Sequence, residues 1–122
     1  EVLWRARAFI RRGDVDDPVG KADVFQDNGL RIHFDAQRVW VEGQQIELTP
    51  TEYTLLTYMV RHRRRILPYQ QLIEHAWDGP DKGTRRGLFV HISRLRDKIE
   101  PDPKQPQFIV TRWGVGYVFL PQ

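Results

Sequence analysis

The sequence predicts an α+β domain in which a small antiparallel sheet is followed by three helices and a closing β-hairpin. Three observations support this fold class. Apolar and polar residues alternate along residues 30–34, as in a strand with one buried face. Apolar residues recur at helical spacing along residues 84–99. Two strand-like runs, residues 108–112 and 117–120, enclose a Gly-rich turn near the C-terminus, which indicates a hairpin.

The N-terminal sheet is expected to contain three strands, with a fourth if Val24 and Phe25 join it. Asn28-Gly29 is a hairpin-turn signal directly before the first alternating run, and Glu42-Gly43 marks a later turn. The three expected strands are residues 30–34, 38–41 and 44–48.

The first of the three helices is expected to begin at Thr49-Pro50-Thr51-Glu52. Thr49 can cap the helix, Pro50 suits the first helical position and Glu52 completes a capping box. The basic run at residues 61–65 closes this helix, where cations interact favourably with the helix dipole. The second helix is expected over residues 69–77, and the third over residues 84–99.

Three helices followed by a hairpin make a winged helix-turn-helix, in which the third helix contacts DNA and the hairpin is the wing. At about 100° per residue, the third helix buries Leu88, Ile92, Leu95 and Ile99. Its opposite face carries two arginines, Arg86 and Arg94, and one apolar residue, Val90. Arginine suits guanine edges and phosphates, and an apolar side chain suits the methyl group of thymine. The residues of this outward face are Arg86, Val90, Ser93, Arg94 and Asp97.

Charge and composition fit a nucleic-acid partner. Residues 1–48 hold seven basic and nine acidic residues, whereas residues 49–122 hold twelve basic and seven acidic residues. The basic C-terminal part therefore favours a polyanion. The chain has no cysteine, no apolar run long enough to span a membrane and no signal-peptide pattern, so we expect a cytoplasmic protein without disulfides.

The domain organisation is expected to have three parts within a longer protein, because the chain lacks a starting Met. Residues 1–12 have the spacing of an amphipathic helix whose partner is missing. Residues 13–23 have the acidic, Gly- and Pro-punctuated composition of a linker, so Asp16 and Asp17 are interpreted as solvated linker charges. Residues 24–122 form the winged-helix domain.

No residues group into a catalytic or metal site in the sequence, so we expect neither an enzyme nor a cofactor. His33, His62 and His75 lack metal-ligand spacing, and His91 is expected to bind a backbone carbonyl. Gly114-Val115-Gly116 lies between two strands and is interpreted as a hairpin turn.

Four motifs resemble the C-terminal DNA-binding (effector) domain of the OmpR/PhoB family of bacterial response regulators. They occur in order over about residues 30–121, and residues 1–12 resemble the last helix of the preceding receiver domain. The motifs are Leu48-Thr49-Pro50-Thr51-Glu52-Tyr53, Val90-His91-Ile92-Ser93-Arg94-Leu95-Arg96, Ile99-Glu100-Pro101-Asp102-Pro103 and Thr111-Arg112-Trp113-Gly114-Val115-Gly116-Tyr117.

The resemblance implies binding to double-stranded DNA at tandem direct-repeat half-sites, regulation by a receiver domain and its histidine kinase, and contact with RNA polymerase. It places the outward residues of the third helix in the major groove and the wing beside the minor groove and backbone. The implied wing contacts are Thr111, Arg112 and Trp113, and Trp77 is implied to lie close to phosphate. The implied polymerase-contact loop contains Pro80, Asp81 and Lys82.

Some roles stay open on sequence grounds. Arg96 and Lys98 can reach phosphates or cover the core with their stems, and Trp113 can pack on DNA or fold back on the third helix. The chain departs from the family at four positions. Gly87 occupies a position where members usually have a β-branched residue, and Phe89 one where they usually have an aspartate. Ser93 replaces an arginine found in some members, and Pro68 replaces a capping residue.

The alternative functions are a winged-helix module that binds a partner protein and a DNA-binding regulator outside two-component signalling. The outward arginines disfavour the protein-binding module.

Overall fold

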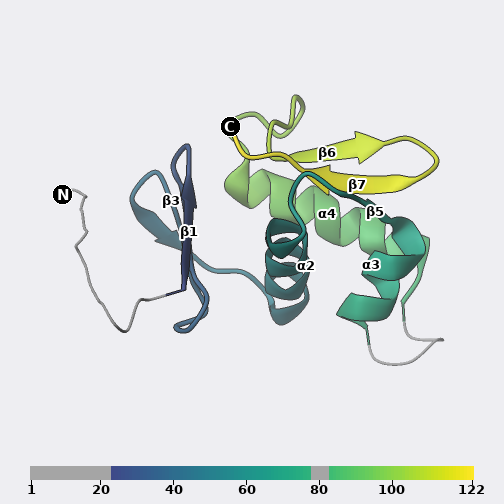
Figure 1. Ribbon diagram of the computed structural model, residues 1–122, viewed down its shortest axis with the longest axis horizontal. Coiled ribbons are helices and arrows are strands. Elements are labelled where there is room, and N and C mark those ends of the chain that lie inside the picture. The colour runs from purple at the N-terminus through teal and green to yellow at the C-terminus, as the bar shows by residue number, and fades with distance from the viewer. Residues whose placement is uncertain (1–22, 78–82) are drawn as a thin grey trace. The chain divides into compact units, whose positions relative to one another are not determined.

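The computed structural model describes residues 23–77 and 83–122 (Figure 1). The chain divides into two compact units, residues 1–43 and 44–122, and each is described by itself. The proposed receiver remnant at residues 1–12, nearly all of the linker including Asp16 and Asp17, and the proposed polymerase loop Pro80, Asp81 and Lys82 lie outside the described residues.

The first unit contains strands β1 (Val24–Asp27), β2 (Leu30–His33) and β3 (Arg38–Val41), which form antiparallel hairpins. Asn28 and Gly29 both have positive φ, as the predicted hairpin turn requires. Leu30, Ile32 and Val39 are buried, so the alternation in the sequence corresponds to one buried face. The sheet order is β1-β2-β3-β4, with β4 at Gln44–Ile46. Val24 and Phe25 lie in β1, which pairs with β2, so the fourth strand that the sequence left open is present.

Helix α2 (Pro50–Arg61) begins as the sequence predicts. The side chain of Thr49 accepts a hydrogen bond from Glu52 N, and Glu52 Oε1 accepts one from Thr49 N, which together make a capping box. Glu52 Oε1 also lies 2.6 Å from Lys98 Nζ on α4 (Arg85–Ile99). Burial of Glu52 by itself raises the pKa of its carboxyl, but the hydrogen bonds from Lys98 and Thr49 outweigh burial and the net pKa is lowered. Lys98 therefore ties α4 to the start of α2.

Helices α3 (Tyr69–Ala76) and α4 pack against each other and against α2. The N-cap of α3 is Pro68, whose side chain makes no capping hydrogen bond, whereas Thr84 caps α4 by accepting from Gly87 N at 3.0 Å. The core of the second unit is made of apolar residues from all three helices and the C-terminal strands. Its largest fully buried members are Leu55, Leu56, Met59, Leu72, Leu88, Ile92, Leu95, Ile99, Phe108 and Phe119.

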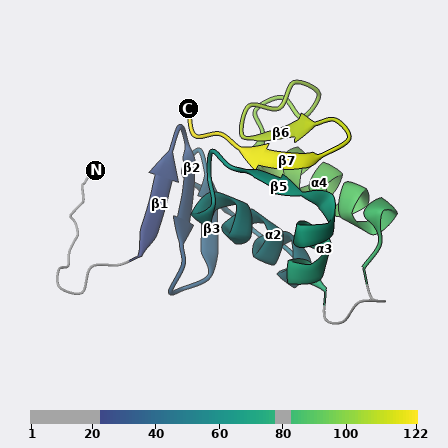
Figure 2. The ribbon, with the colours of Figure 1, turned by 45° about the vertical axis from the view of Figure 1, so that its right-hand side comes forward.

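The C-terminal sheet has three strands in the order β5-β7-β6, whereas the sequence predicts a two-stranded hairpin. Strands β6 (Ile109–Arg112) and β7 (Gly116–Phe119) form the predicted hairpin, and β5 (Ile66–Pro68) pairs with β7 on its other side (Figure 2). A Cβ atom on Gly116 would overlap the carbonyl group of Leu67, so the close pairing of β5 and β7 requires glycine there. β5 thus joins the wing to the segment between α2 and α3.

The loop that enters β6 is held by a buried carboxylate. Glu100 follows the last residue of α4 and is 7% exposed. Its two oxygens accept hydrogen bonds from the backbone N–H groups of Gln107, Phe108 and Ile109, at 2.8–3.1 Å. This satisfies a buried charge and fixes the start of the wing relative to the end of α4.

Candidate nucleic-acid interface

Helix α4 has the two faces that its sequence predicts. Leu88, Ile92, Leu95 and Ile99 are at most 1% exposed, because α2 and α3 pack against this stripe. The side chains of Arg86, Ser93 and Arg94 are exposed on the other face. Val90, an apolar residue, is 40% exposed beside them. The division into a buried and a basic outward face is therefore confirmed, and contact of this outward face with DNA stays a prediction.

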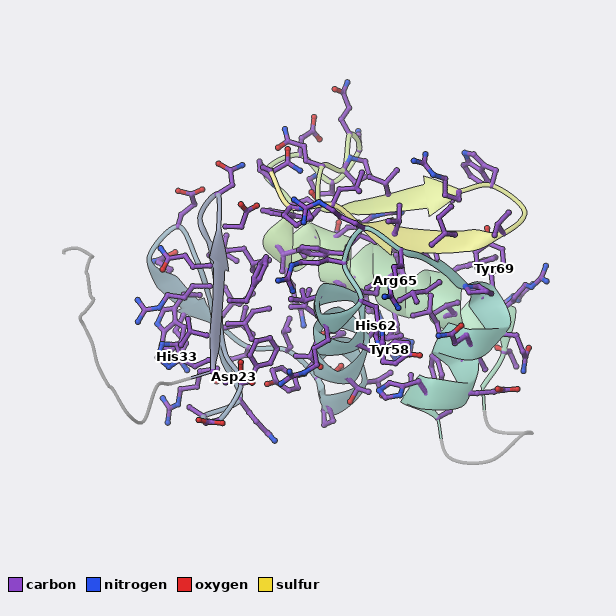
Figure 3. The ribbon with its side chains drawn as sticks, in the orientation of Figure 1. Asp23, His33, Tyr58, His62, Arg65 and Tyr69 are labelled. Atoms are coloured by element: carbon purple, nitrogen blue, oxygen red, sulfur yellow. The ribbon has the colours of Figure 1, made fainter. Side chains whose placement is uncertain are left out.

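Three aromatic rings join the start of α3, the first half of α4 and the wing. The ring of Phe89 lies 5.4 Å from that of Tyr69 and 6.4 Å from that of Tyr117, both in edge-to-face geometry. Tyr69 and Tyr117 also meet edge to face at 5.6 Å. The guanidinium of Arg85 lies 5.1 Å from the centroid of the Tyr69 ring (labelled in Figure 3). Phe89 thus packs between α3 and the wing. The sequence had identified it only as a departure from the family pattern.

Arg96 makes its hydrogen bonds within the domain. Its Nε and Nη2 atoms donate to the carbonyl of Ile109 at 3.1 and 2.8 Å, and Nη2 also donates to Thr111 Oγ1 at 2.8 Å. The guanidinium lies 5.4 Å from the centroid of the Tyr117 ring. Burial lowers the pKa of Arg96, while electrostatic interactions with Tyr117 and Glu100 act in the opposite direction. These contacts favour a role for Arg96 in positioning β6, which differs from both roles that the sequence left open.

The wing exposes its turn. Trp113 is 89% exposed, so it does not fold back on α4, which was one of the two expected arrangements. Arg112 is also exposed, and Thr111 is half-buried where it accepts the hydrogen bond from Arg96. The carbonyl of Val115 accepts a hydrogen bond from Tyr69 N at 3.1 Å. The turn is therefore held at the start of α3 while the indole points into solvent.

Trp77 is packed against the first turns of α4 by two glycines. A Cβ atom on Gly83 would lie 2.9 Å from the indole of Trp77 and 2.6 Å from Ile73 Cγ2, which is too close. A Cβ atom on Gly87 would lie 3.2 Å from Thr84 Oγ1, against the N-cap. The indole also meets the ring of His91 edge to face at 5.4 Å. Gly87, which from propensity alone weakens the helix, thus leaves room for the cap and for Trp77.

His91 binds a backbone carbonyl, as predicted. Its Nδ1 atom lies 2.7 Å from the carbonyl oxygen of Gly87, one turn earlier in α4. The interactions of Arg96, Glu100 and Trp77 could not be found in the sequence, because each depends on a partner in another element. The only sequence signal for the role of Arg96 was its position at the flank of the apolar stripe of the helix, where a long charged side chain can lie against other elements.

The model of the family described as "Transcriptional regulatory protein, C terminal" matches residues 43–119. The chain is 38% identical over 117 residues to the sensory transduction protein RegX3 of Mycobacterium tuberculosis, covering 96% of this chain and 52% of the relative. It is 37% identical over 117 residues to the DNA-binding response regulator MtrA of Mycolicibacterium smegmatis, covering 96% and 50%. The chain thus spans about half the length of these curated relatives.

Solved structures are similar to this chain over most of its length. The response regulator DrrB of Thermotoga maritima, described as an OmpR/PhoB homolog, matches with a TM-score of 0.74 and 30% identity, covering 80% of this chain and 44% of that one. The DNA-binding domain of Klebsiella pneumoniae RstA, solved in complex with the RstA box, matches with a TM-score of 0.69 and 26% identity, covering 82% and 99%. These matches agree with the predicted winged-helix fold.

Proposed function

This chain belongs to the family of C-terminal domains of transcriptional regulatory proteins, and we propose that it binds double-stranded DNA at specific sequences as the effector domain of a two-component response regulator. The outward face of α4 is the observation that carries this proposal. Arg86, Val90 and Arg94 are exposed there, on a rigid helix whose other face fills the core. Such a face suits the major groove, where arginine reaches guanine O6 and N7 and an apolar group meets the thymine methyl.

Different residues have different tasks in this proposal. Arg94, Val90 and Ser93 read base edges from the middle of α4, and Arg86 holds phosphate near its start. The wing places Arg112 and Trp113 beside the adjacent backbone and minor groove. Trp77, which is half-buried beside the first turns of α4, offers its indole edge to a phosphate.

Arg96 and Thr111 act indirectly in this proposal, although both were expected among the DNA contacts. Arg96 donates to Ile109 and Thr111 of β6 and so sets the distance between α4 and the wing. Tyr69, Phe89 and Tyr117 fill the space between the same two elements. These contacts use the Nε and Nη2 donors of Arg96 and hold its guanidinium against β6.

The partners of the intact protein follow from the same proposal. Two copies occupy tandem direct-repeat half-sites on DNA. A receiver domain precedes this domain and is phosphorylated by a cognate histidine kinase in the cytoplasm. RNA polymerase is contacted through the loop that contains Pro80, Asp81 and Lys82.

Titration of the chain on duplexes tests the proposal. A binding site is first selected from a random duplex library, and a scrambled duplex of the same composition is the control. We expect Arg94→Ala to cost about 1–3 kcal/mol on the selected site and less on the scrambled one. Equal losses on both duplexes would make Arg94 a phosphate contact.

The salt dependence tests the phosphate contacts separately. If about 5–7 phosphates are neutralised, the logarithm of the binding constant falls with the logarithm of salt concentration with a slope of roughly −4 to −6. Binding that does not change with salt, or no preference for any duplex in the selection, would contradict the proposal and favour a protein-binding module.

A further inference from the structure

A basic hollow lies at the C-terminal end of α2 and is lined by five consecutive residues. These residues are Arg61, His62, Arg63, Arg64 and Arg65, and the hollow measures about 510 Å³. All four arginines are exposed, and the His62 ring packs on the Tyr58 ring at 4.7 Å (Figure 3). Arg63 Nη1 donates to the Val60 carbonyl at 3.0 Å, which holds its guanidinium at the end of the helix. One turn of chain thus gathers four positive charges around a concave surface.

The backbone at Arg64 adopts a conformation that arginine disfavours. Its φ of 69° lies in the left-handed region, where glycine or asparagine would be accommodated with less strain. The Arg64 N–H donates to the Phe119 carbonyl at 2.9 Å, so the fold imposes this conformation. An arginine at such a position adds like charge and backbone strain without contributing to the core. Strained positions of this kind cluster at binding sites.

The size and charge of the hollow together indicate the class of ligand. The hollow is shallow and largely open to solvent, and its volume of about 510 Å³ gives room for a small ligand to lie on the surface. A stable protein interface requires about 20–30 residues on each side, far more than the five residues here. Four of the five lining residues are arginines, and a guanidinium matches phosphate oxygens in geometry and charge. A small anion with several phosphate groups therefore fits better than an acidic protein surface.

The hollow is also separate from the proposed DNA-reading face. Helix α2 packs against the buried side of α4, so the outward residues Arg86, Val90 and Arg94 point away from α2. A duplex seated on that outward face approaches from the side opposite α2. We propose that the hollow formed by residues 61–65 binds a small polyphosphate anion independently of the outward face of α4.

Calorimetric titration with sodium tripolyphosphate tests this proposal, with sodium sulfate at equal ionic strength as the reference anion. We expect saturable binding of tripolyphosphate at one site and much weaker binding of sulfate. Arg64→Asn removes a guanidinium while keeping a residue that tolerates positive φ, and Arg65→Gln removes another from an exposed position. Each is expected to weaken tripolyphosphate binding about fivefold, which corresponds to ~1 kcal/mol, without lowering the melting temperature.

Two variants serve as matched controls. Gln37 also has a positive φ, of 56°, and does not line the hollow, so Gln37→Asn places asparagine at a second positive-φ position as a control for Arg64→Asn. Arg86→Ala removes an exposed arginine from the outward face of α4. Both controls are expected to leave tripolyphosphate binding unchanged.

Several outcomes would overturn the proposal. These are equal binding of sulfate and tripolyphosphate, loss of binding in Arg86→Ala, unchanged binding in both Arg64→Asn and Arg65→Gln, or competition by a polyglutamate peptide at lower concentration than tripolyphosphate. A nucleoside triphosphate forms a second arm of the test. Equal affinity for it and for tripolyphosphate would support recognition of phosphates alone, and tighter binding would support the hollow as part of a nucleotide site.

Discussion

Replacing Arg96 with methionine separates a residue that positions the wing from a residue that contacts phosphate. Methionine keeps an unbranched apolar stem but removes the guanidinium, which donates to the Ile109 carbonyl and to Thr111 Oγ1. A hydrogen bond from a charged group contributes about 1.5–3 kcal/mol to stability. Because Arg96 is only half-buried, we expect the loss to lie near the lower end, about 2 kcal/mol.

Thermal unfolding and DNA titration together measure this change. For a domain of this size, a loss of about 2 kcal/mol lowers the melting temperature by roughly 8–16 °C. Affinity for a selected duplex should fall because the wing is no longer fixed relative to α4. The salt slope should stay the same, because a phosphate contact is not lost.

Arg94→Met provides the matched control on the same helix. Arg94 is exposed, so this variant should unfold at nearly the same temperature as the parent chain. Its weaker binding should come from the lost base contact, and the salt slope should fall by about 0.9 only if Arg94 also neutralises a phosphate. If Arg96→Met instead keeps its stability and loses about 0.9 of the slope, Arg96 is a phosphate ligand and the positioning role is refuted.

Three further outcomes are expected. Gly116→Ala should destabilise the chain by up to about 3 kcal/mol in urea unfolding, because a Cβ atom would overlap the carbonyl of Leu67, and a stability equal to that of the parent would contradict the close β5–β7 pairing. Trp113→Ala should leave the melting temperature unchanged, since the indole is 89% exposed, but should weaken duplex binding; unchanged affinity would remove Trp113 from the proposed interface. The net pKa of Glu52 is lowered in the folded chain, so its contribution to stability is complete above the ordinary carboxyl pKa and is lost as pH falls through the folded value. Urea midpoints measured from pH 6 to pH 3 should therefore decline more steeply in the parent than in Lys98→Met, and parallel declines would contradict the Lys98–Glu52 pairing.

Most of the fold could be predicted from patterns that lie within one helix, strand or turn. The capping box of Thr49 and Glu52 spans three residues, and the alternation at residues 30–34 lies within one strand, so both could be predicted without knowledge of the tertiary structure. β5 could not be predicted, because three residues ending in proline show no periodicity and the strand is defined by its pairing with β7.

The parts of the site that depend on distant partners were missed for the same reason. Lys98 meets Glu52 across 46 residues, and Arg96 reaches Thr111 across 15. From sequence, Arg96 and Lys98 were basic residues beside the apolar stripe of the third helix, and the choice between phosphate contact and covering the core was left open. Only the packing of α4 against α2 and the wing assigns them to internal contacts.

The pairing of β5 with β7 has a mechanical consequence for any duplex held by both α4 and the wing. β5, which precedes α3, is hydrogen-bonded to β7, and the first N–H of α3 donates to the carbonyl of Val115 in the hairpin turn. Because α3 also packs against α4, these bonds restrict movement of the wing relative to α4. The spacing between α4 and the wing is therefore fixed. A target duplex whose groove width does not match this spacing must bend or twist to contact both elements. The free energy of that deformation depends on the base steps of the duplex, so the fixed spacing would favour some sequences over others without any base contact.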